Sequence, residues 1–166
     1  SSVSNIRRIS SNLQSIAKYC GELIKFDGHC LYSFPNPKIL AEAGEKPLLD
    51  LGLGFRARYL TQISNLIAAE KISLMSLRDT SYQQAKDSLI WFPGIGNKVA
   101  DCVLVFSLNK LEGFPIDRWV RRALEDWYDL NPKTKYEDVA YWARERWGEN
   151  AGYVQQYLFH HRRLMN

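Results

Sequence analysis

The chain has 166 residues, of which 46% are hydrophobic and 24% are charged. These proportions are typical of a globular protein and exclude a disordered, collagen-like or fibrous chain. The 22 basic and 18 acidic residues give a formal net charge of +4, which favours a polyanionic partner. The length predicts one domain over residues 1–166, or two small lobes.

The composition also argues against membranes, disulfides and metal clusters. No apolar run approaches the roughly 20 residues that a membrane helix needs. Cys20, Cys30 and Cys102 form no C-x-x-C pair, and their odd number predicts reduced thiols without zinc or an iron–sulfur cluster. Neither a secretory leader nor a lipidation signal is present, so we expect an intracellular protein, in a prokaryotic or archaeal cytoplasm or in a nucleus. The start at Ser1 predicts a piece of a longer chain.

Apolar residues recur at helical spacing from the first residues onward. Ile6, Ile9, Leu13 and Ile16 form one stripe, and no segment alternates as a strand would. We therefore predict an all-α protein. The expected helices span 4–19, 22–33, 37–43, 54–70, 80–91, 97–109, 118–128, 134–147 and 150–163.

Two helix starts have specific capping signals. Asn36 precedes Pro37, which places a capping side chain before a proline at the first helical position. Thr134 and Glu137 have the spacing of a capping box. Both signals support helix boundaries at these residues.

The most informative segment is the turn between the helices expected at 80–91 and 97–109. Gly94 and Gly96 flank Ile95, so the turn is expected to use unusual backbone angles while Ile95 anchors it in the core. Free turn amides, with the positive end of the helix that begins near Asn97, would bind an anionic oxygen such as a DNA phosphate. The alternative is a sharp corner between two packed helices. The longer pattern of residues 92–100, apolar-Pro-Gly-Ile-Gly-x-Lys-x-Ala, resembles the helix-hairpin-helix signature, with the hairpin at 89–109.

A second motif follows the turn. Residues 111–117 form a Gly/Pro-rich loop that ends in Asp117, nineteen residues beyond Lys98. In both motifs the chain resembles the helix-hairpin-helix DNA glycosylases, and the 8-oxoguanine branch has this spacing. The resemblance implies an all-α, two-lobed glycosylase fold, with Lys98 and Asp117 as catalytic residues.

The chemistry explains why an amine and a carboxylate should meet. Cleavage of a glycosidic bond develops positive charge on the sugar, which a carboxylate stabilises, and an amine can then attack the anomeric carbon to form a Schiff base. Elimination of the strand's phosphate follows, so one lysine supports base excision and strand nicking. Burial and the helix N-terminus are expected to favour the unprotonated amine of Lys98. The non-catalytic alternatives are that Lys98 only contacts a phosphate and that Asp117 only caps a helix.

The resemblance to 8-oxoguanine DNA glycosylases extends over nearly the whole chain, from 1–9 through 51–59 to 155–159. It implies three further groups of site residues. Cys102, Phe106, Gln155 and Phe159 would enclose the flipped damaged base; Arg8, Phe55 and Arg56 would act on the opposite strand; Gly94, Ile95, Gly96, Asn97 and Trp119 would contact the DNA backbone. For Cys102 and Phe159, core packing is the alternative.

The chain also departs from the family pattern. Val3 replaces an asparagine that faces the opposite base, Phe55 replaces a tyrosine, and Trp119 and Arg162 replace a paired histidine and acid. An N-terminal lobe that the eukaryote-type enzymes use for base recognition has no counterpart before Ser1.

The resemblance implies double-stranded DNA with a damaged base as the partner and a monomeric enzyme. It implies no organic cofactor and no metal ligand set, although the carbonyls of the hairpin turn are a candidate site for a monovalent cation. Two rival functions stay open. One is a glycosylase-lyase for another damaged base, and the other is a helix-hairpin-helix fragment that binds DNA without chemistry.

Overall fold

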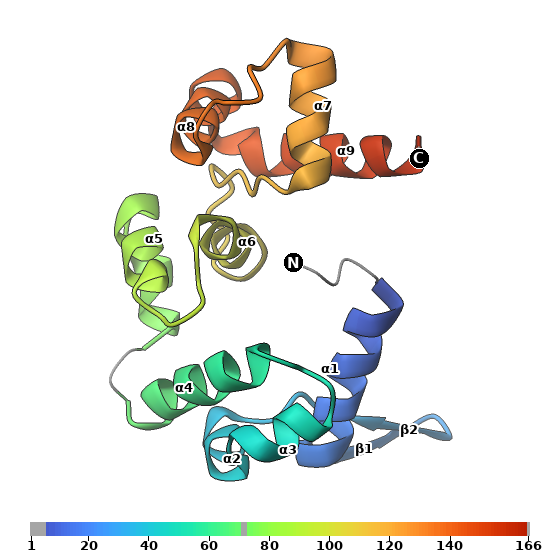
Figure 1. Ribbon diagram of the computed structural model, residues 1–166. Coiled ribbons are helices and arrows are strands. Elements are labelled where there is room, and N and C mark those ends of the chain that lie inside the picture. The colour runs from blue at the N-terminus through green and yellow to red at the C-terminus, as the bar shows by residue number, and fades with distance from the viewer. Residues whose placement is uncertain (1–5, 71–72, 166) are drawn as a thin grey trace. The chain divides into compact units, whose positions relative to one another are not determined.

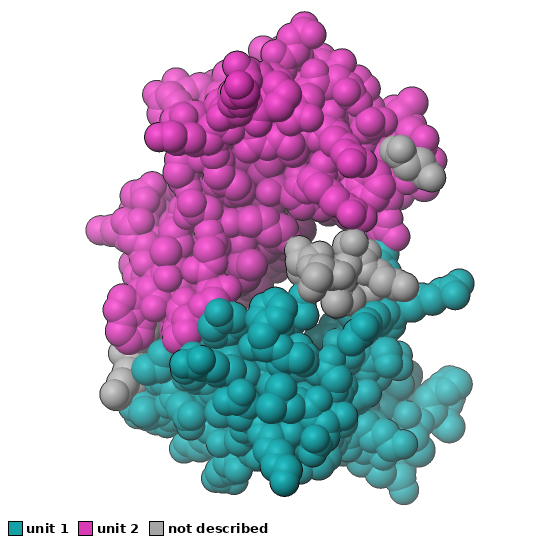
Figure 2. Space-filling view, in the orientation of Figure 1, with its two compact units in different colours: residues 1–73 teal, residues 74–166 magenta. Residues whose placement is uncertain are grey.

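The computed structural model describes residues 6–70 and 73–165. It divides the chain into two compact units, residues 1–73 (unit 1) and 74–166 (unit 2), which Figures 1 and 2 show. Each unit is described by itself below. Nearly all the regular structure of the described residues is helical, as the spacing of the apolar residues predicted.

Unit 1 consists of helices around a small core and one β-hairpin. Its elements are α1 (Ile6–Cys20), β1 (Leu23–Phe26), β2 (His29–Tyr32), α2 (Pro37–Ala43), α3 (Glu45–Asp50) and α4 (Arg56–Ala68). The apolar stripe of α1 contributes Ile16 to this core, where it joins Leu40, Leu48, Leu53 and Ala57. The remaining stripe residues of α1, Ile6, Ile9 and Leu13, are about half exposed.

The helix predicted over 22–33 is wrong, because these residues form the antiparallel hairpin β1–β2. Leu23 pairs with Tyr32 and Phe26 with His29, which leaves a two-residue turn of Asp27 and Gly28. Both turn residues have positive φ, 48° and 75°, as the Asp-Gly hairpin turn requires. Every residue of the two strands is exposed, so burial imposes no alternation of apolar and polar residues that a sequence pattern could show.

The capping signals have mixed outcomes. Asn36 caps α2 as predicted, since its Oδ1 accepts from the amides of Lys38 and Ile39 at 2.7 and 3.4 Å. The capping box predicted at Thr134 and Glu137 is wrong: the N-cap of α8 (Tyr136–Trp147) is Lys135, with no side-chain cap. The carboxylate of Glu137 instead accepts from Lys86 Nζ at 3.1 and 3.3 Å.

Unit 2 contains the hairpin and the loop that the sequence singled out. Its elements are η1 (Met75–Asp79), α5 (Tyr82–Ile90), α6 (Asn97–Ser107), α7 (Arg118–Tyr128), α8, η2 (Gly148–Asn150) and α9 (Ala151–Leu164). One core cluster joins η1, α5 and α6, and another joins residues 114–116 to α7, α8 and α9. A capping box of Ser81 and Gln84, which the sequence analysis missed, begins α5.

These helices are short and mixed in composition. Among the residues that the structure describes, none of them combines the length and apolar character that crossing a lipid bilayer requires.

Candidate active site

The hairpin turn between α5 and α6 is anchored as predicted. Phe92 is 2% exposed, and Ile95 packs against the cluster of α5 and α6. The Ile95 amide donates to the Phe92 carbonyl at 3.1 Å, which closes the turn. Gly94 has φ +77°, a backbone conformation that a residue with a Cβ rarely adopts.

Two details of the predicted turn are wrong. The Ile95 amide is not free, because the turn itself uses it. Gly96 does not need an unusual backbone, since its φ of −100° and ψ of 179° are open to any residue. A Cβ at Gly96 would meet nothing within 4 Å inside the described chain, so the fold does not need a glycine there. The missing side chain leaves room for another molecule to approach the start of α6.

The N-terminus of α6 is suited to an anionic oxygen. Gly96 is the N-cap and provides no side-chain cap, so the first-turn amides lack the partner that Ser, Thr, Asp or Asn would supply. Asn97, half-buried, is the first residue of the helix. Amides at a helix N-terminus, with the helix dipole, favour a phosphate oxygen.

Lys98 lies in this first turn of α6, and its side chain is exposed. The burial predicted for Lys98 is therefore not found in the protein alone, because the first turn of α6 is at the surface. An exposed lysine is accessible to a large substrate such as DNA.

Cys102 follows Lys98 by one helical turn, and the two side chains meet. Burial raises the pKa of the Cys102 thiol above its usual value of 9.0. The Lys98 ammonium opposes this shift through its charge and a hydrogen bond to the sulfur, whereas the nearby carboxylates of Asp101 and Asp117 add to it. The charges of Lys98 and Asp117 thus both influence the thiol of Cys102, and Lys98 also contacts it.

Asp117 caps α7, the role that its position predicted. Its Oδ1 accepts from the amides of Trp119 and Val120 at 2.8 and 2.9 Å. Within the described residues, Oδ2 accepts no hydrogen bond from a side chain or an amide, so capping leaves it for chemistry. A single carboxylate can thus hold the helix start and face a substrate.

The loop before Asp117 packs closely against its neighbours. A Cβ at Gly113 would lie 2.8 Å from Val105 Cγ2, so only glycine fits between the loop and α6. The Leu111 carbonyl accepts from the Gly152 amide of α9 at 2.7 Å, and the Ile116 amide donates to Tyr136 Oη at 3.2 Å. The main chain that leads to Asp117 is therefore held by α6, α8 and α9.

The residues expected to enclose a base have different surroundings. Gln155 is 4% exposed in α9, and its Oε1 accepts from Gln156 Nε2. Phe159 packs against the core cluster of α7, α8 and α9, with the Arg163 guanidinium 5.9 Å from its ring centre. Phe106, near the end of α6, is 59% exposed. Phe159 therefore takes part in core packing, and Gln155 is a buried amide within the same helix.

Trp119 lies beside Asp117 within a cationic surface. The guanidinium groups of Arg118 and Arg122 lie 4.8 and 5.8 Å from its ring. Arg162, which departs from the family pattern, pairs with Asp126 at 2.7 Å. Exposed arginines near a helix N-terminus favour an anionic partner on this face of α7.

The residues predicted to act on the opposite strand are in unit 1. Arg8 is exposed on α1, and Phe55 is 61% exposed directly before α4. The Arg56 guanidinium stacks on the Phe55 ring at 4.6 Å. Val3, which bears on opposite-base preference, lies outside the described residues.

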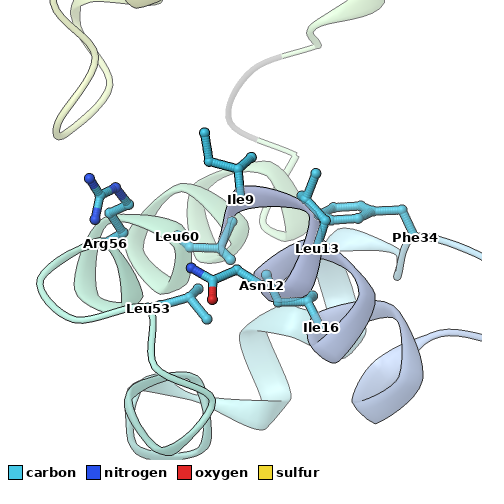
Figure 3. A pocket seen from close by; sticks show the side chains of 8 residues that line it. All are labelled: Ile9, Asn12, Leu13, Ile16, Phe34, Leu53, Arg56 and Leu60. Carbon is cyan, nitrogen blue, oxygen red and sulfur yellow. The ribbon is translucent and has the colours of Figure 1, made fainter. Parts of the chain in front are cut away.

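Arg56 also borders a cavity of about 340 Å³ between α1 and α4 (Figure 3). Asn12 and Arg56 are the polar side chains in a lining that is otherwise apolar: Ile9, Leu13, Ile16, Phe34, Leu53 and Leu60. Figure 3 shows the α1 and α4 side chains facing each other across this space.

The sequence analysis missed a group of buried polar residues beneath this site. Asp101 is fully buried on α6 and accepts from Tyr82 and Tyr136, while Lys86 pairs with it at 3.3 Å. A signal was present, because Asp101 is a charged residue within the apolar run of 99–106. As for metals, the described part of the chain brings together no group of three or more His, Cys, Asp or Glu that could hold one.

Comparison with known proteins identifies the family. The family model for the HhH-GPD superfamily base excision DNA repair protein matches residues 4–149. A probable N-glycosylase/DNA lyase of Methanothermobacter thermautotrophicus is 31% identical over 180 residues, covering 96% of this chain and 56% of the relative. An N-glycosylase/DNA lyase of Arabidopsis thaliana is 31% identical over 170 residues, covering 96% of this chain and 46% of the relative.

Solved structures agree on the fold. The 8-oxoguanine glycosylase/lyase of Clostridium acetobutylicum, bound to double-stranded DNA with cytosine opposite 8-oxoguanine, matches with a TM-score of 0.93 and 31% identity. The match covers 99% of this chain and 57% of that structure. The chain thus spans about half the length of the relatives that it matches.

Proposed function

Because the chain belongs to the HhH-GPD superfamily of base excision DNA repair proteins, we propose that it is the catalytic part of a DNA glycosylase with AP lyase activity. Its substrate would be duplex DNA that contains oxidised guanine. The observation that carries the proposal is that Lys98 contacts Cys102 in the first turns of α6, while the Asp117 carboxylate at the start of α7 acts on the same thiol through its charge. The reaction needs an accessible amine, which Lys98 offers, and a carboxylate, which Asp117 offers.

In the proposed reaction, Asp117 stabilises the positive charge that develops on the sugar as the bond to the damaged base breaks. The base leaves with the bonding electron pair and takes up a proton. The amine of Lys98 forms a bond to C1′ of the sugar, and opening of the sugar ring gives the Schiff base. Removal of a C2′ proton then breaks the bond from C3′ to the phosphate oxygen. Water finally hydrolyses the imine and restores Lys98.

The hairpin turn would hold the DNA backbone during this sequence. Two observations support a phosphate contact at the start of α6. Gly96 has no side chain that would block the approach of a phosphate, and the first turn of α6 has no side-chain cap. Gly94 and Ile95 shape the turn, and Asn97 begins the helix. Such contacts position the duplex without reading its bases. Trp119 with its flanking arginines would extend the same cationic face.

We further propose that Phe106, Gln155 and Phe159 receive the extruded base together with Cys102. A flipped base is read through stacking and through hydrogen bonds to its edge, which an exposed aromatic ring and a buried amide can supply. Arg8, Phe55 and Arg56 of unit 1 would contact the opposite strand. The arginine stacked on Phe55 supports this, since a guanidinium suits nucleobase acceptors.

We also propose that the chain acts as a monomer on genomic DNA inside the cell, and that it uses no organic cofactor. For a monovalent cation, the hairpin turn offers main-chain carbonyls, of which that of Phe92 already accepts from Ile95. A cation there would act on phosphate binding and on no step of the chemistry. Its contribution can be measured as the change in duplex affinity when sodium or potassium is replaced by a bulky organic cation at equal ionic strength.

Borohydride trapping tests the central claim. The parent chain is mixed with a duplex that carries one 8-oxoguanine opposite cytosine, and with the same duplex undamaged. We expect a covalent protein–DNA band with the damaged duplex alone, because borohydride reduces the imine to a stable amine. Lys98→Gln should abolish the band, and the control Lys135→Gln, at an exposed lysine of the same unit, should retain it.

The same assay separates the rivals. Bands with other damaged bases but not with 8-oxoguanine would assign a different substrate to the same mechanism. The absence of any band, together with duplex binding that weakens in Gly96→Val and not in Lys98→Gln, would assign a non-catalytic DNA-binding module.

A further inference from the structure

Asp101 is a buried carboxylate that the proposed chemistry does not use. It is 0% exposed and lies on α6, one helical turn beyond Lys98. A buried charge is costly unless hydrogen bonds and an opposite charge compensate it. The contacts of Asp101 therefore identify what the charge holds together.

Two helices, α5 and α8, supply these contacts. Tyr82 Oη of α5 donates to Oδ1 at 2.6 Å, and Tyr136 Oη of α8 donates to Oδ2 at 2.7 Å. Lys86 Nζ, 2% exposed, lies 3.3 Å from Oδ2 and also bonds Glu137 of α8. The two hydroxyls stay protonated, because burial and the Asp101 charge raise the pKa of each tyrosine.

The two tyrosines differ in one respect. Tyr136 Oη also accepts from the Ile116 amide at 3.2 Å and lies 3.5 Å from the Phe114 carbonyl, so it contacts the loop that ends at Asp117. Tyr82 Oη accepts instead from Arg144 at 3.1 Å and from Lys86 at 3.3 Å, and these contacts are away from the loop. Asp101 thus joins the helix of Lys98 to the loop of Asp117 through one hydroxyl.

We propose that Tyr136, oriented by Asp101, is a positioning residue that fixes the Asp117 carboxylate relative to Lys98. Ile116 directly precedes Asp117, and the backbone there cannot shift without breaking the bond to Tyr136. The inference rests on the proposed function for its effect on turnover, but the geometric claim concerns the chain alone.

The first test compares two matched variants. Tyr136→Phe and Tyr82→Phe each remove one buried hydroxyl from Asp101, and only Tyr136→Phe releases the loop. We expect Tyr136→Phe to lower the single-turnover excision rate about 10- to 100-fold, since a displacement near 1 Å can cost that much. Duplex affinity should change less than about twofold, and Tyr82→Phe should keep the rate within about threefold. Equal rates in two variants of similar melting temperature would overturn the proposal.

The second test needs no activity. Native-state hydrogen exchange is measured at the Ile116 amide and at the Trp119 and Val120 amides, which bond to Asp117 Oδ1. The Leu124 amide of α7 is the internal reference for all three rates. In Tyr136→Phe we expect faster exchange at all three amides, and in Tyr82→Phe at none. A faster Ile116 with unchanged Trp119 and Val120 would overturn the positioning claim.

The two tests keep the failures apart. If the parent chain forms no trapped band, the proposed function fails, and the exchange comparison still decides whether Tyr136 places Asp117. If the parent chain traps DNA but the two variants excise equally, the inference alone fails.

Discussion

Helix α6 carries Lys98 and Asp101 one turn apart, and their surroundings are opposite. Lys98 is exposed beside Cys102, whereas Asp101 is fully buried and holds two tyrosines and Lys86. An exposed charge contributes little to stability but can react with a large substrate. A buried charge can contribute only through the groups that it orders. The comparison indicates that α6 leaves the amine of its first turn at the surface and buries the carboxylate of the turn that follows.

The largest effect is expected when the buried ion pair of Asp101 and Lys86 is broken. Lys86→Met removes the cation that pairs with Asp101 and leaves the carboxylate with its two hydroxyl donors. We expect a loss of about 3 kcal/mol in the free energy of unfolding, because an uncompensated buried charge is costly. Urea unfolding measures it.

Lys98→Gln is the matched control on the exposed side of the helix. It should change the free energy of unfolding by less than about 0.5 kcal/mol, as surface substitutions do. Equal losses in the two variants would refute the contrast between the exposed Lys98 and the buried pair of Asp101 and Lys86.

Alkaline pH provides the next largest effect. Tyr82 and Tyr136 have pKa values raised above 10.0 by burial, so the folded chain keeps two protons that the unfolded chain loses above pH 10. Since the folded state binds more protons, stability falls as pH rises, by about 1 kcal/mol for each tyrosine between pH 10 and 11.

Urea unfolding at pH 9, 10 and 11 measures this slope. Tyr136→Phe should remove about half of the stability loss that the two tyrosines cause between pH 10 and 11. Tyr141→Phe, at a side chain that is 59% exposed, should leave that loss unchanged. A parent chain whose stability is flat over this range would contradict the burial of the two hydroxyls.

Asp117 tests whether capping and chemistry coexist on the exposed side. Asp117→Ala should lower the free energy of unfolding by about 1 kcal/mol, because the Trp119 and Val120 amides lose their acceptor. Asp117→Asn keeps an oxygen acceptor and should cost only a few tenths of a kcal/mol.

Excision should fall by at least about 100-fold in both Asp117 variants, because neither supplies the negative charge. Thermal unfolding and single-turnover excision measure the two roles. An active Asp117→Asn variant would remove Asp117 from the chemistry and leave it a cap.

The smallest effect sharpens the contact between Lys98 and Cys102. Burial raises the pKa of the Cys102 thiol and Lys98 partly opposes this, so Lys98→Gln should raise that pKa further. Iodoacetamide at pH 8.5 should then alkylate Cys102 a few-fold more slowly than in the parent chain, since the thiolate is the nucleophile. Peptide mass spectrometry gives the rate, with exposed Cys30 as the internal reference. An unchanged Cys102 rate would contradict the contact.

The site illustrates what sequence can predict. The turn at 92–96 follows from residue type and spacing, and the cap at Asp117 follows from its place before α7. The catalytic roles of Lys98 and Asp117 rest on the resemblance to the helix-hairpin-helix glycosylases. Tyr136 hydrogen-bonds both Asp101 and the Ile116 amide, and no local sequence pattern relates these three distant residues.

The fold divides in the same way. Helix periodicity and caps determined most helices, with α2 and α7 at the predicted bounds, because these signals act over three or four residues. The hairpin at 23–32 was missed because exposed strands carry no alternation, and α3 because it is short and contains Pro47.

By itself, the sequence determined the helical class and the hairpin turn, and it pointed to Lys98 and Asp117 as the residues that we propose to be reactive. Tertiary structure alone decided that Lys98 is exposed and that the Ile95 amide donates to a carbonyl within the turn. It also decided that Glu137 pairs with Lys86 instead of forming the predicted capping box. The physical reason is that burial and ion pairing depend on elements distant in the chain. A sequence pattern records which groups are available, and packing decides which of them meet.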